Sequence, residues 1–289
     1  MTVAFVLSGG ASLGAVQVGM AQALESEGIG PEMVVGTSVG AVNGAWLAGQ
    51  RPVGGLADLW RSMKRSTLFP LRPLVGLRGF AGRTNHVVPN SGLRRLLERH
   101  VTFPRLERAP IPFSVITTEA RSGEEVVLDR GPTVEAILAS SALPGIFPPV
   151  TIGGRTLIDG GVVDNTPISQ AIIAGADEVW VLAAGFSCAL QEAPRGALEM
   201  GMHAVGLLVQ QRLVMETTGR DYPVPVHLIP PPCPISVTPT DFSQGAELIE
   251  RSRATTLQWL RDGRPEVRPR RIDHDGPGVD DVEVGDRLS

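Results

Sequence analysis

The 289-residue chain has little cysteine and no long apolar run, and these absences exclude several classes of protein. Its 2 cysteines, Cys188 and Cys233, are too few for a disulfide framework, and we expect both to be buried as small apolar side chains. No stretch approaches the ~18 apolar residues of a membrane span. The first residues also lack the positive region of a signal peptide, so the sequence predicts a cytoplasmic protein.

Motifs for cofactors and nucleic acids are missing as well. The cysteines and histidines do not have the spacing of metal ligands, and the acidic residues do not follow a calcium-loop pattern. The glycine-rich turn near residue 10 fits neither the dinucleotide-binding fingerprint nor the P-loop. A net charge of −4 argues against nucleic acid as a general partner. We therefore expect no cofactor, no metal and no nucleic-acid partner.

The order of apolar runs predicts the fold class. Predicted strands alternate with helical stretches and cover residues 2–7, 33–36, 112–118, 126–128, 178–183 and 224–229. This alternation predicts an α/β fold with a mainly parallel central sheet and helices on both faces. We expect one domain over residues 1–262. Residues 263–289 are acidic and lack apolar periodicity, so they are predicted to form a disordered tail.

A Gly-x-Ser-x-Gly pentapeptide, residues 36–40, joins a predicted strand to a helical stretch of small residues. A serine in this setting is typical of a nucleophile elbow, whose tight turn requires glycine two residues before and two residues after it. Ser38 would then lie at a helix N-terminus, where N–H groups and the helix dipole favour a developing negative charge. Glycine and serine also form ordinary turns, so the pentapeptide alone leaves a purely structural interpretation open.

Two more glycine-rich turns follow predicted strands. Residues 8–14 could bring backbone N–H groups close to a ligand oxygen, either a phosphate or an oxyanion, although a simple packing turn is the alternative. Asp159 ends a short apolar strand and precedes two glycines, at a position where α/β folds place catalytic side chains. A helix cap or an Asx turn is the alternative for this aspartate.

Taken in order, these three motifs resemble those of the patatin-like acyl hydrolase family, and residues 140–149 and 165–167 resemble further family segments. The resemblance implies a patatin-like three-layer architecture and a lipid acyl hydrolase, a phospholipase A or esterase that works through an acyl-enzyme. It also implies a Ser-Asp dyad in which Ser38 is the nucleophile and Asp159 the base. The family often has Arg or Lys where this chain has Leu13, so any role of that cation is not supplied here.

Backbone groups complete the site that the resemblance implies. The oxyanion donors would be the N–H groups of Gly9, Gly10, Ala11 and Val39. The turns themselves would be shaped by Gly14, Gly36, Gly40, Gly160 and Gly161.

Other functions remain open at this point. The acyl group could pass to an acceptor other than water, or the chain could be a non-catalytic lipid- or nucleotide-binding module, which would need neither Ser38 nor Asp159. A histidine base is the other catalytic alternative, since His203, His227 and His274 follow Asp159. Their sequence surroundings instead predict a helix residue, a strand residue and a tail residue.

Residues 59–97 have no acidic residue but many cations interleaved with apolar side chains. Such a mixture can adsorb to an anionic lipid surface or cover an acyl pocket as a lid. We therefore predict peripheral membrane contact through this window, with a surface loop and a core-packing helix over 91–100 as the alternative. The cations are Arg61, Lys64, Arg65, Arg72, Arg78, Arg83, Arg94 and Arg95.

Overall fold

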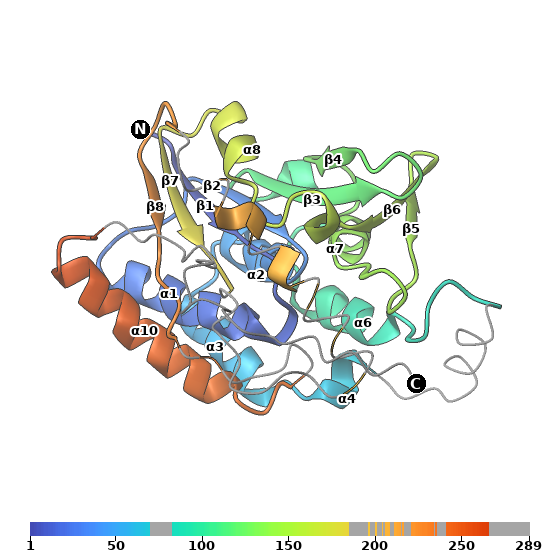
Figure 1. Ribbon diagram of the computed structural model, residues 1–289, viewed down its shortest axis with the longest axis horizontal. Coiled ribbons are helices and arrows are strands. Elements are labelled where there is room, and N and C mark those ends of the chain that lie inside the picture. Colours follow the sequence, from blue (N-terminus) through green and yellow to red (C-terminus); the bar gives the residue numbers. More distant parts are fainter. Residues whose placement is uncertain are drawn as a thin grey trace, which may run out of the picture.

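The computed structural model contains a mainly parallel sheet between two unequal layers of helices (Figure 1). It describes residues 1–69, 83–184, 221–233 and 241–265, together with isolated positions between 196 and 235. The strand order is β5-β6-β3-β2-β1-β7-β8, and β4 pairs with β3. The strands are β1 (Val3–Leu7), β2 (Met33–Thr37), β3 (Phe113–Glu119), β4 (Glu125–Leu128), β5 (Val150–Ile152), β6 (Arg155–Asp159), β7 (Glu178–Leu182) and β8 (Val226–Leu228).

The strand directions confirm the predicted fold class. Strands β1, β2, β3, β7 and β8 form parallel pairs, whereas β4 and β6 run antiparallel to β3. Each of the six predicted strands is present, with ends that differ by one or two residues. The prediction missed β5, a three-residue edge strand that runs antiparallel to β6.

The helical layers are formed by segments whose bounds agree with the apolar patterns. The helix predicted over residues 91–100 is observed as α6. The α-helices are α1 (Gly14–Ser26), α2 (Val39–Ala48), α3 (Val53–Ser62), α4 (Arg65–Leu68), α6 (Ser91–His100), α7 (Thr133–Ser140), α8 (Ile168–Ile173) and α10 (Gly245–Arg261). Short 3-10 helices are η1 (Ala11–Leu13), η2 (Leu106–Arg108) and η3 (Gly160–Val162).

Alternation along the central strands divides the core into two clusters. In β1, Phe5 and Leu7 face the larger cluster, whereas Ala4 and Val6 face the smaller one. Helices α1, α2, α3 and α10 cover the larger side, and α8 packs on the other. Because the central strands are buried on both faces, they read as near-continuous apolar runs in the sequence.

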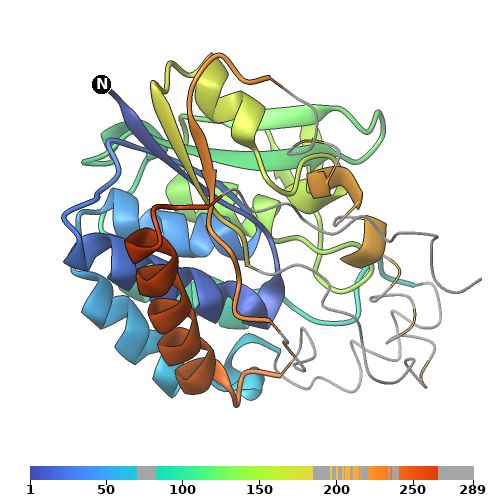
Figure 2. The same ribbon diagram turned by 60° about the vertical axis from the view of Figure 1, so that its left-hand side comes forward.

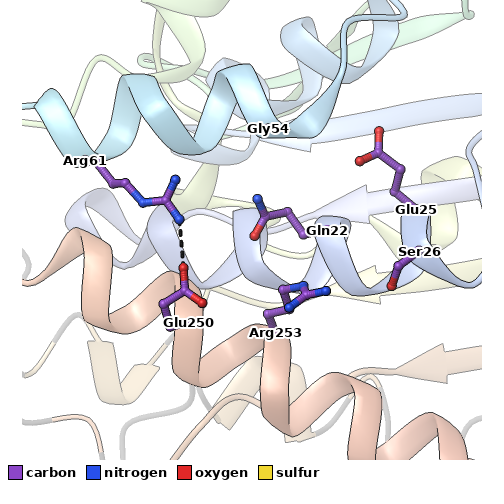
Figure 3. A pocket seen from close by; sticks show the side chains of 7 residues that line it. All are labelled: Gln22, Glu25, Ser26, Gly54, Arg61, Glu250 and Arg253. Atoms are coloured by element: carbon purple, nitrogen blue, oxygen red, sulfur yellow. Dashed lines mark hydrogen bonds and ion pairs between the residues drawn. The ribbon is translucent and has the colours of Figure 1, made fainter.

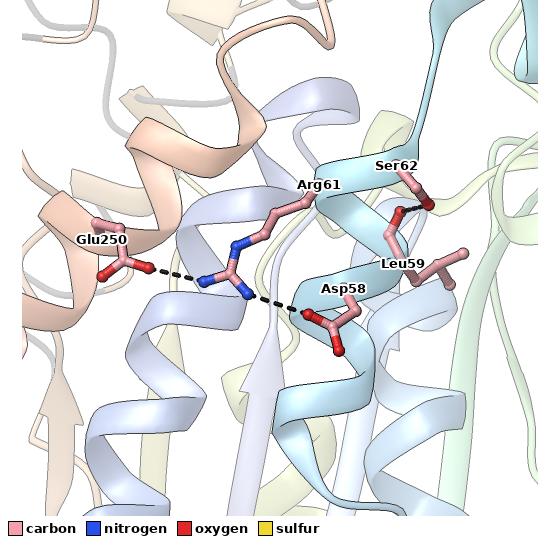
Figure 4. Close-up of polar contacts among 5 residues, drawn as sticks. All are labelled: Asp58, Leu59, Arg61, Ser62 and Glu250. Carbon is pink, nitrogen blue, oxygen red and sulfur yellow. Dashed lines mark hydrogen bonds and ion pairs between the residues drawn. The ribbon is translucent and has the colours of Figure 1, made fainter.

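The last described helix, α10, packs against the buried first helix, α1, in the larger layer (Figure 2). Their backbones approach so closely that a Cβ on Gly19 would overlap the Ile249 carbonyl oxygen. Arg61 of α3 forms an ion pair with Glu250 of α10 at 2.7 Å and a second ion pair with Asp58 of its own helix at 3.2 Å (Figure 4). The first of these ion pairs ties α10 to α3.

A polar surface groove of about 420 Å³ lies between these three helices (Figure 3). Its lining residues come from α1, α3 and α10, and none belongs to the three glycine-rich motifs. They are Gln22, Glu25, Ser26, Gly54, Arg61, Glu250 and Arg253.

The remaining predictions concern the two cysteines and the C-terminal tail. Cys233 is exposed and disulfide-bonded, so the expectation of a buried thiol is wrong for this residue. Cys188 and residues 266–289, most of the predicted tail, lie outside the described residues.

None of the helices that the structure describes is long and apolar enough to span a bilayer.

Candidate active site

The register of β3 brings the Ser38 turn and the Asp159 turn together. Strand β2 ends with Thr37 opposite Ile116, and β6 ends with Asp159 opposite Thr117, the next residue of β3. Strand β4 pairs with Val115 and Ile116, which also pair with β2, and with Thr117 and Thr118, which also pair with β6. Strands β2 and β6 must therefore share the other edge of β3. The two strands therefore meet end to end, and the residues that leave them lie side by side.

Ser38 has the strained backbone expected of a nucleophile elbow. Its φ of 55° and ψ of −122° are unfavourable for a residue with a side chain, and α2 begins at the next residue. A Cβ on Gly36 would lie 2.6 Å from the Gly40 carbonyl oxygen, and a Cβ on Gly40 would overlap the Leu7 carbonyl oxygen. The turn itself requires Gly36, as the sequence predicts, whereas Gly40 is required by the close approach of strand β1.

Ser38 is hydrogen-bonded to Asp159. Its Oγ donates to Asp159 Oδ2 at 2.7 Å, while the Gly161 amide donates to Oδ1 at 2.8 Å. The Asp159 backbone is held by Thr118, whose hydroxyl donates to its carbonyl oxygen at 2.9 Å. Both carboxylate oxygens are therefore engaged, and Oδ2 is placed to accept the serine proton.

Burial changes the acidity of this carboxyl group. Asp159 is only 4% exposed, and the loss of solvation raises its pKa to about 6, although the hydrogen bonds from Ser38 and Gly161 act in the opposite direction. A carboxylate with this pKa is a stronger base than a solvated aspartate, whose usual pKa is 3.8. It is still largely ionised at neutral pH.

The glycine-rich turn at residues 8–14 lies against both other turns. Its Gly9 amide donates to the Asn165 carbonyl oxygen at 3.2 Å, and Asn165 Nδ2 donates back to the Gly9 carbonyl at 3.4 Å. The Gly9 N–H is thus already used, which differs from the prediction that it serves an oxyanion. Gly9 instead allows close approach, since a Cβ there would lie 3.2 Å from Ser38 Cβ.

Three of the predicted oxyanion donors remain available. The amides of Gly10, Ala11 and Val39 form no hydrogen bond with any residue that the structure describes. Ala11 has a positive φ of 50°, unusual for a residue other than glycine. These unpaired N–H groups flank the Ser38 turn on the side of η1 and on the side of α2.

Sequence reasoning did not assign a role to Ser140, which holds the elbow. The Ser38 amide donates to Ser140 Oγ at 2.8 Å, and Ser140 is fully buried at the end of α7. The residue lies in a segment that the family resemblance singled out, but only the tertiary contact reveals what it binds. Asp164 accepts from the Thr166 amide at 3.2 Å. Leu13 packs against the larger core cluster.

No histidine that the structure describes contacts Ser38 or Asp159. His227 pairs with Glu178 at 2.8 Å, His86 pairs with Asn85, and His100 stacks near Trp46, so none of these rings contacts Ser38 or Asp159. His203 and His274 lie outside the described residues.

The basic window divides into paired and exposed cations. Arg94 forms a bidentate pair with Glu135, at 2.8 and 3.0 Å, and Arg61 pairs across α3 and α10 as described above. Lys64, Arg65, Arg83 and Arg95 are exposed and form no ion pair with a described residue, while Arg72 and Arg78 lie outside the described residues. Helix α6 covers residues 91–100 and buries Leu93 and Leu97, as the core-packing alternative predicts.

A largely parallel sheet with a strained serine at a strand-to-helix elbow places this chain among the α/β proteins built around a nucleophile elbow. A sequence model of the family described as "Patatin-like phospholipase" matches residues 5–172. The match covers more than half of the chain, which therefore belongs to the patatin-like phospholipase family, as its motifs predict.

Individual relatives agree with this assignment. The chain is 31% identical to Lysophospholipase NTE1 of Mycosarcoma maydis over 196 residues, 64% of this chain and 10% of that protein. It is 32% identical to an uncharacterized NTE family protein of Mycobacterium tuberculosis over 177 residues, 61% of this chain and 46% of the relative. This chain thus matches less than half of each relative. The crystal structure of VipD from Legionella pneumophila shares the fold, with a TM-score of 0.51 at 16% identity, covering 90% of this chain and 67% of VipD.

Proposed function

We propose that this protein hydrolyses acyl esters of lipids through a Ser38–Asp159 dyad. The observation that carries the proposal is the 2.7 Å hydrogen bond from Ser38 Oγ to a buried carboxylate, formed at a strained elbow. Membership of the patatin-like phospholipase family and similarity to a protein named as a lysophospholipase support lipid esters as the substrate class.

The reaction follows from the positions of these groups. Ser38 Oγ attacks the ester carbonyl carbon while its proton passes to Asp159 Oδ2, and the carbonyl oxygen becomes an oxyanion. Collapse of this intermediate breaks the bond to the leaving alcohol, which takes the proton from Asp159 and leaves an acyl-enzyme. A water molecule then gives a proton to Asp159 and attacks the acyl carbon. The second intermediate collapses to release the fatty acid, and Ser38 regains its proton.

The N–H groups of Gly10, Ala11 and Val39 stabilise the oxyanion in both halves of this reaction. They have no internal partner among the described residues, so a substrate oxygen can bind them without breaking a protein hydrogen bond. A donor of this kind contributes about 10²–10³ to kcat in serine hydrolases. Gly9 shapes the loop, because its own amide is bound to Asn165.

The exposed cations of the basic window bring the enzyme to lipid. Lys64, Arg65, Arg83 and Arg95 are exposed, and cations near an anionic bilayer contribute about 1 kcal/mol each. A quadruple change to Gln should weaken binding to phosphatidylserine vesicles and leave hydrolysis of a soluble nitrophenyl ester intact. Unchanged vesicle binding at low salt would mean that the enzyme meets its lipid through another face.

Labelling with a fluorophosphonate probe tests the proposed activity. We expect wild-type protein to be labelled and to release fatty acid from lysophosphatidylcholine, and we expect Ser38→Ala to do neither. Absence of labelling in the folded wild type would favour the binding-module alternative. Formation of a new ester when a long-chain alcohol is added, without release of fatty acid, would favour the acyltransferase alternative.

A further inference from the structure

Two buried side-chain amides connect the glycine-rich turn to the elbow helix. Gln17 of α1 and Asn43 of α2 are each 1% exposed. Asn43 Nδ2 donates to Gln17 Oε1 at 2.9 Å, so the two amides bond directly across the interface of the two helices. Neither residue belongs to the three glycine-rich motifs.

The remaining polar atoms of the pair bind the backbone around the turn. Gln17 Nε2 donates to the carbonyl oxygens of Ser8, at 2.7 Å, and Leu182, at 3.0 Å. Asn43 Nδ2 also donates to the carbonyl oxygen of Gly14, at 3.0 Å. Ser8 and Gly14 are the residues at the two ends of the turn, so the pair holds it at both ends.

Every hydrogen-bonding atom of the two amides is used. Gln17 Nε2 and Asn43 Nδ2 each donate two hydrogen bonds. Gln17 Oε1 accepts from Asn43 Nδ2, and Asn43 Oδ1 accepts from the indole N–H of Trp60 at 2.9 Å. A fully satisfied polar network in a buried site has one low-energy arrangement and resists distortion. It therefore fixes the separation of the structures it joins.

Those structures carry the two sides of the proposed oxyanion hole. Gly10 and Ala11 lie between the anchored residues Ser8 and Gly14, and Ala11 has a strained positive φ that the surroundings must maintain. Val39 begins the helix on which Asn43 lies, one turn further on. Loss of the network would let these donors move relative to one another.

We propose that Gln17 and Asn43 are positioning residues that set the spacing between the Gly10–Ala11 donors and the Val39 donor. This inference rests on the proposed ester hydrolysis and adds to it residues that touch neither substrate nor dyad. A displacement of about 1 Å in such donors can cost about 100-fold in rate. The effect should fall on the transition state, so kcat should change and KM should not.

Gln17→Met and Asn43→Leu test the proposal, because each keeps the approximate side-chain volume and removes the amide. For hydrolysis of nitrophenyl butyrate we expect kcat to fall about 10- to 100-fold with KM within about threefold of wild type. Affinity for a trifluoromethyl ketone, whose adduct with Ser38 carries an oxyanion, should fall in the same proportion as kcat. Affinity for a non-reactive substrate analogue should not.

Ser252→Ala is the matched control. Ser252 is fully buried on α10, and its hydroxyl donates to the carbonyl oxygen of Val16 on α1 at 2.7 Å. Val16 precedes Gln17 in the sequence, but this hydrogen bond does not involve the glycine-rich turn. Its loss should lower thermal stability and leave kcat unchanged. If kcat in Ser252→Ala falls as far as it does in Gln17→Met and Asn43→Leu, the proposal is overturned, because any weakening of α1 would then reduce turnover.

Asn43→Ser replaces Asn43→Leu if the leucine variant does not fold. It should also lower kcat and the affinity for the trifluoromethyl ketone together. Wild-type kcat in folded Gln17→Met and Asn43→Ser would overturn the positioning role. Wild-type hydrolysis by Ser38→Ala, measured in parallel, would instead overturn the proposed function itself.

Discussion

Asp159→Asn should make the protein more stable at neutral pH while it removes activity. The wild-type carboxyl group is buried and has its pKa raised from 3.8 to about 6, so the native state holds a proton that the unfolded chain releases. Between these two pKa values the native state binds more protons than the unfolded state, and stability must fall as the pH rises. The ionised carboxylate therefore costs the fold about 3 kcal/mol at pH 7 and about half as much at pH 5.

Asparagine removes this cost and can keep both contacts. Its Oδ1 can accept from the Gly161 amide, as the Asp159 carboxylate does. Its Nδ2 can donate to Ser38 Oγ, whereas Asp159 Oδ2 accepts a hydrogen bond from that hydroxyl. We therefore expect Asp159→Asn to gain up to about 3 kcal/mol in free energy of unfolding at pH 7, and about half that gain at pH 5. Asp164, whose pKa burial raises to about 7, contributes equally to both proteins and cancels from the difference.

Urea unfolding of the two proteins at pH 7, 6 and 5 measures this difference. The midpoint of Asp159→Asn should be higher at pH 7 and converge on the wild-type midpoint as the pH falls, with equal m-values. An Asp159→Asn protein that is equally or less stable at every pH would refute the reasoning. Burial would then not penalise the carboxylate, and the raised basicity on which the dyad depends would be lost.

Three more predictions concern the surroundings of the dyad. On a soluble ester, kcat/KM should fall about tenfold per pH unit below about 6, because only ionised Asp159 accepts the serine proton, and a flat profile down to pH 5 would contradict this. Ser140→Ala should cost about 1–3 kcal/mol of stability and lower kcat, since it leaves the elbow amide unpaired. Ser141→Ala removes a buried hydroxyl that has no hydrogen-bond partner among the described residues and should cost much less. Gly10→Ala would force a Cβ onto Ala184 and should lower kcat at least 100-fold, while Gly54→Ala, with open space around it, should be silent in the same assay.

The sequence was sufficient for the motifs that local rules determine. Glycine at position 36 follows from the collision that a side chain would cause within the turn, whereas the collision at position 40 is with strand β1, which the local rule does not include. The central strands were predicted because burial on both faces makes them continuous apolar runs. Strand β5 was missed because its three residues are only partly buried or exposed and carry no such run.

Contacts between distant segments could not be predicted in this way. The Gly9 amide was expected to bind an oxyanion, but it donates to Asn165, which is 156 residues away in the chain. Ser140, which accepts the hydrogen bond of the Ser38 amide, lies 102 positions later in the chain. Gln17 lies in α1, and its partner carbonyls belong to β7 and to the glycine-rich turn. The approach of Ser38 to Asp159 was implied by family resemblance, and its physical cause is the register of two strands on β3.

The most direct test of the dyad is ester hydrolysis by Ser38→Ala, Asp159→Asn and the double variant. If the two residues act as one unit, each single change should remove nearly all turnover and the double change should be no worse than either. Substantial turnover by folded Asp159→Asn would contradict the account, because the serine proton would then be accepted by another group.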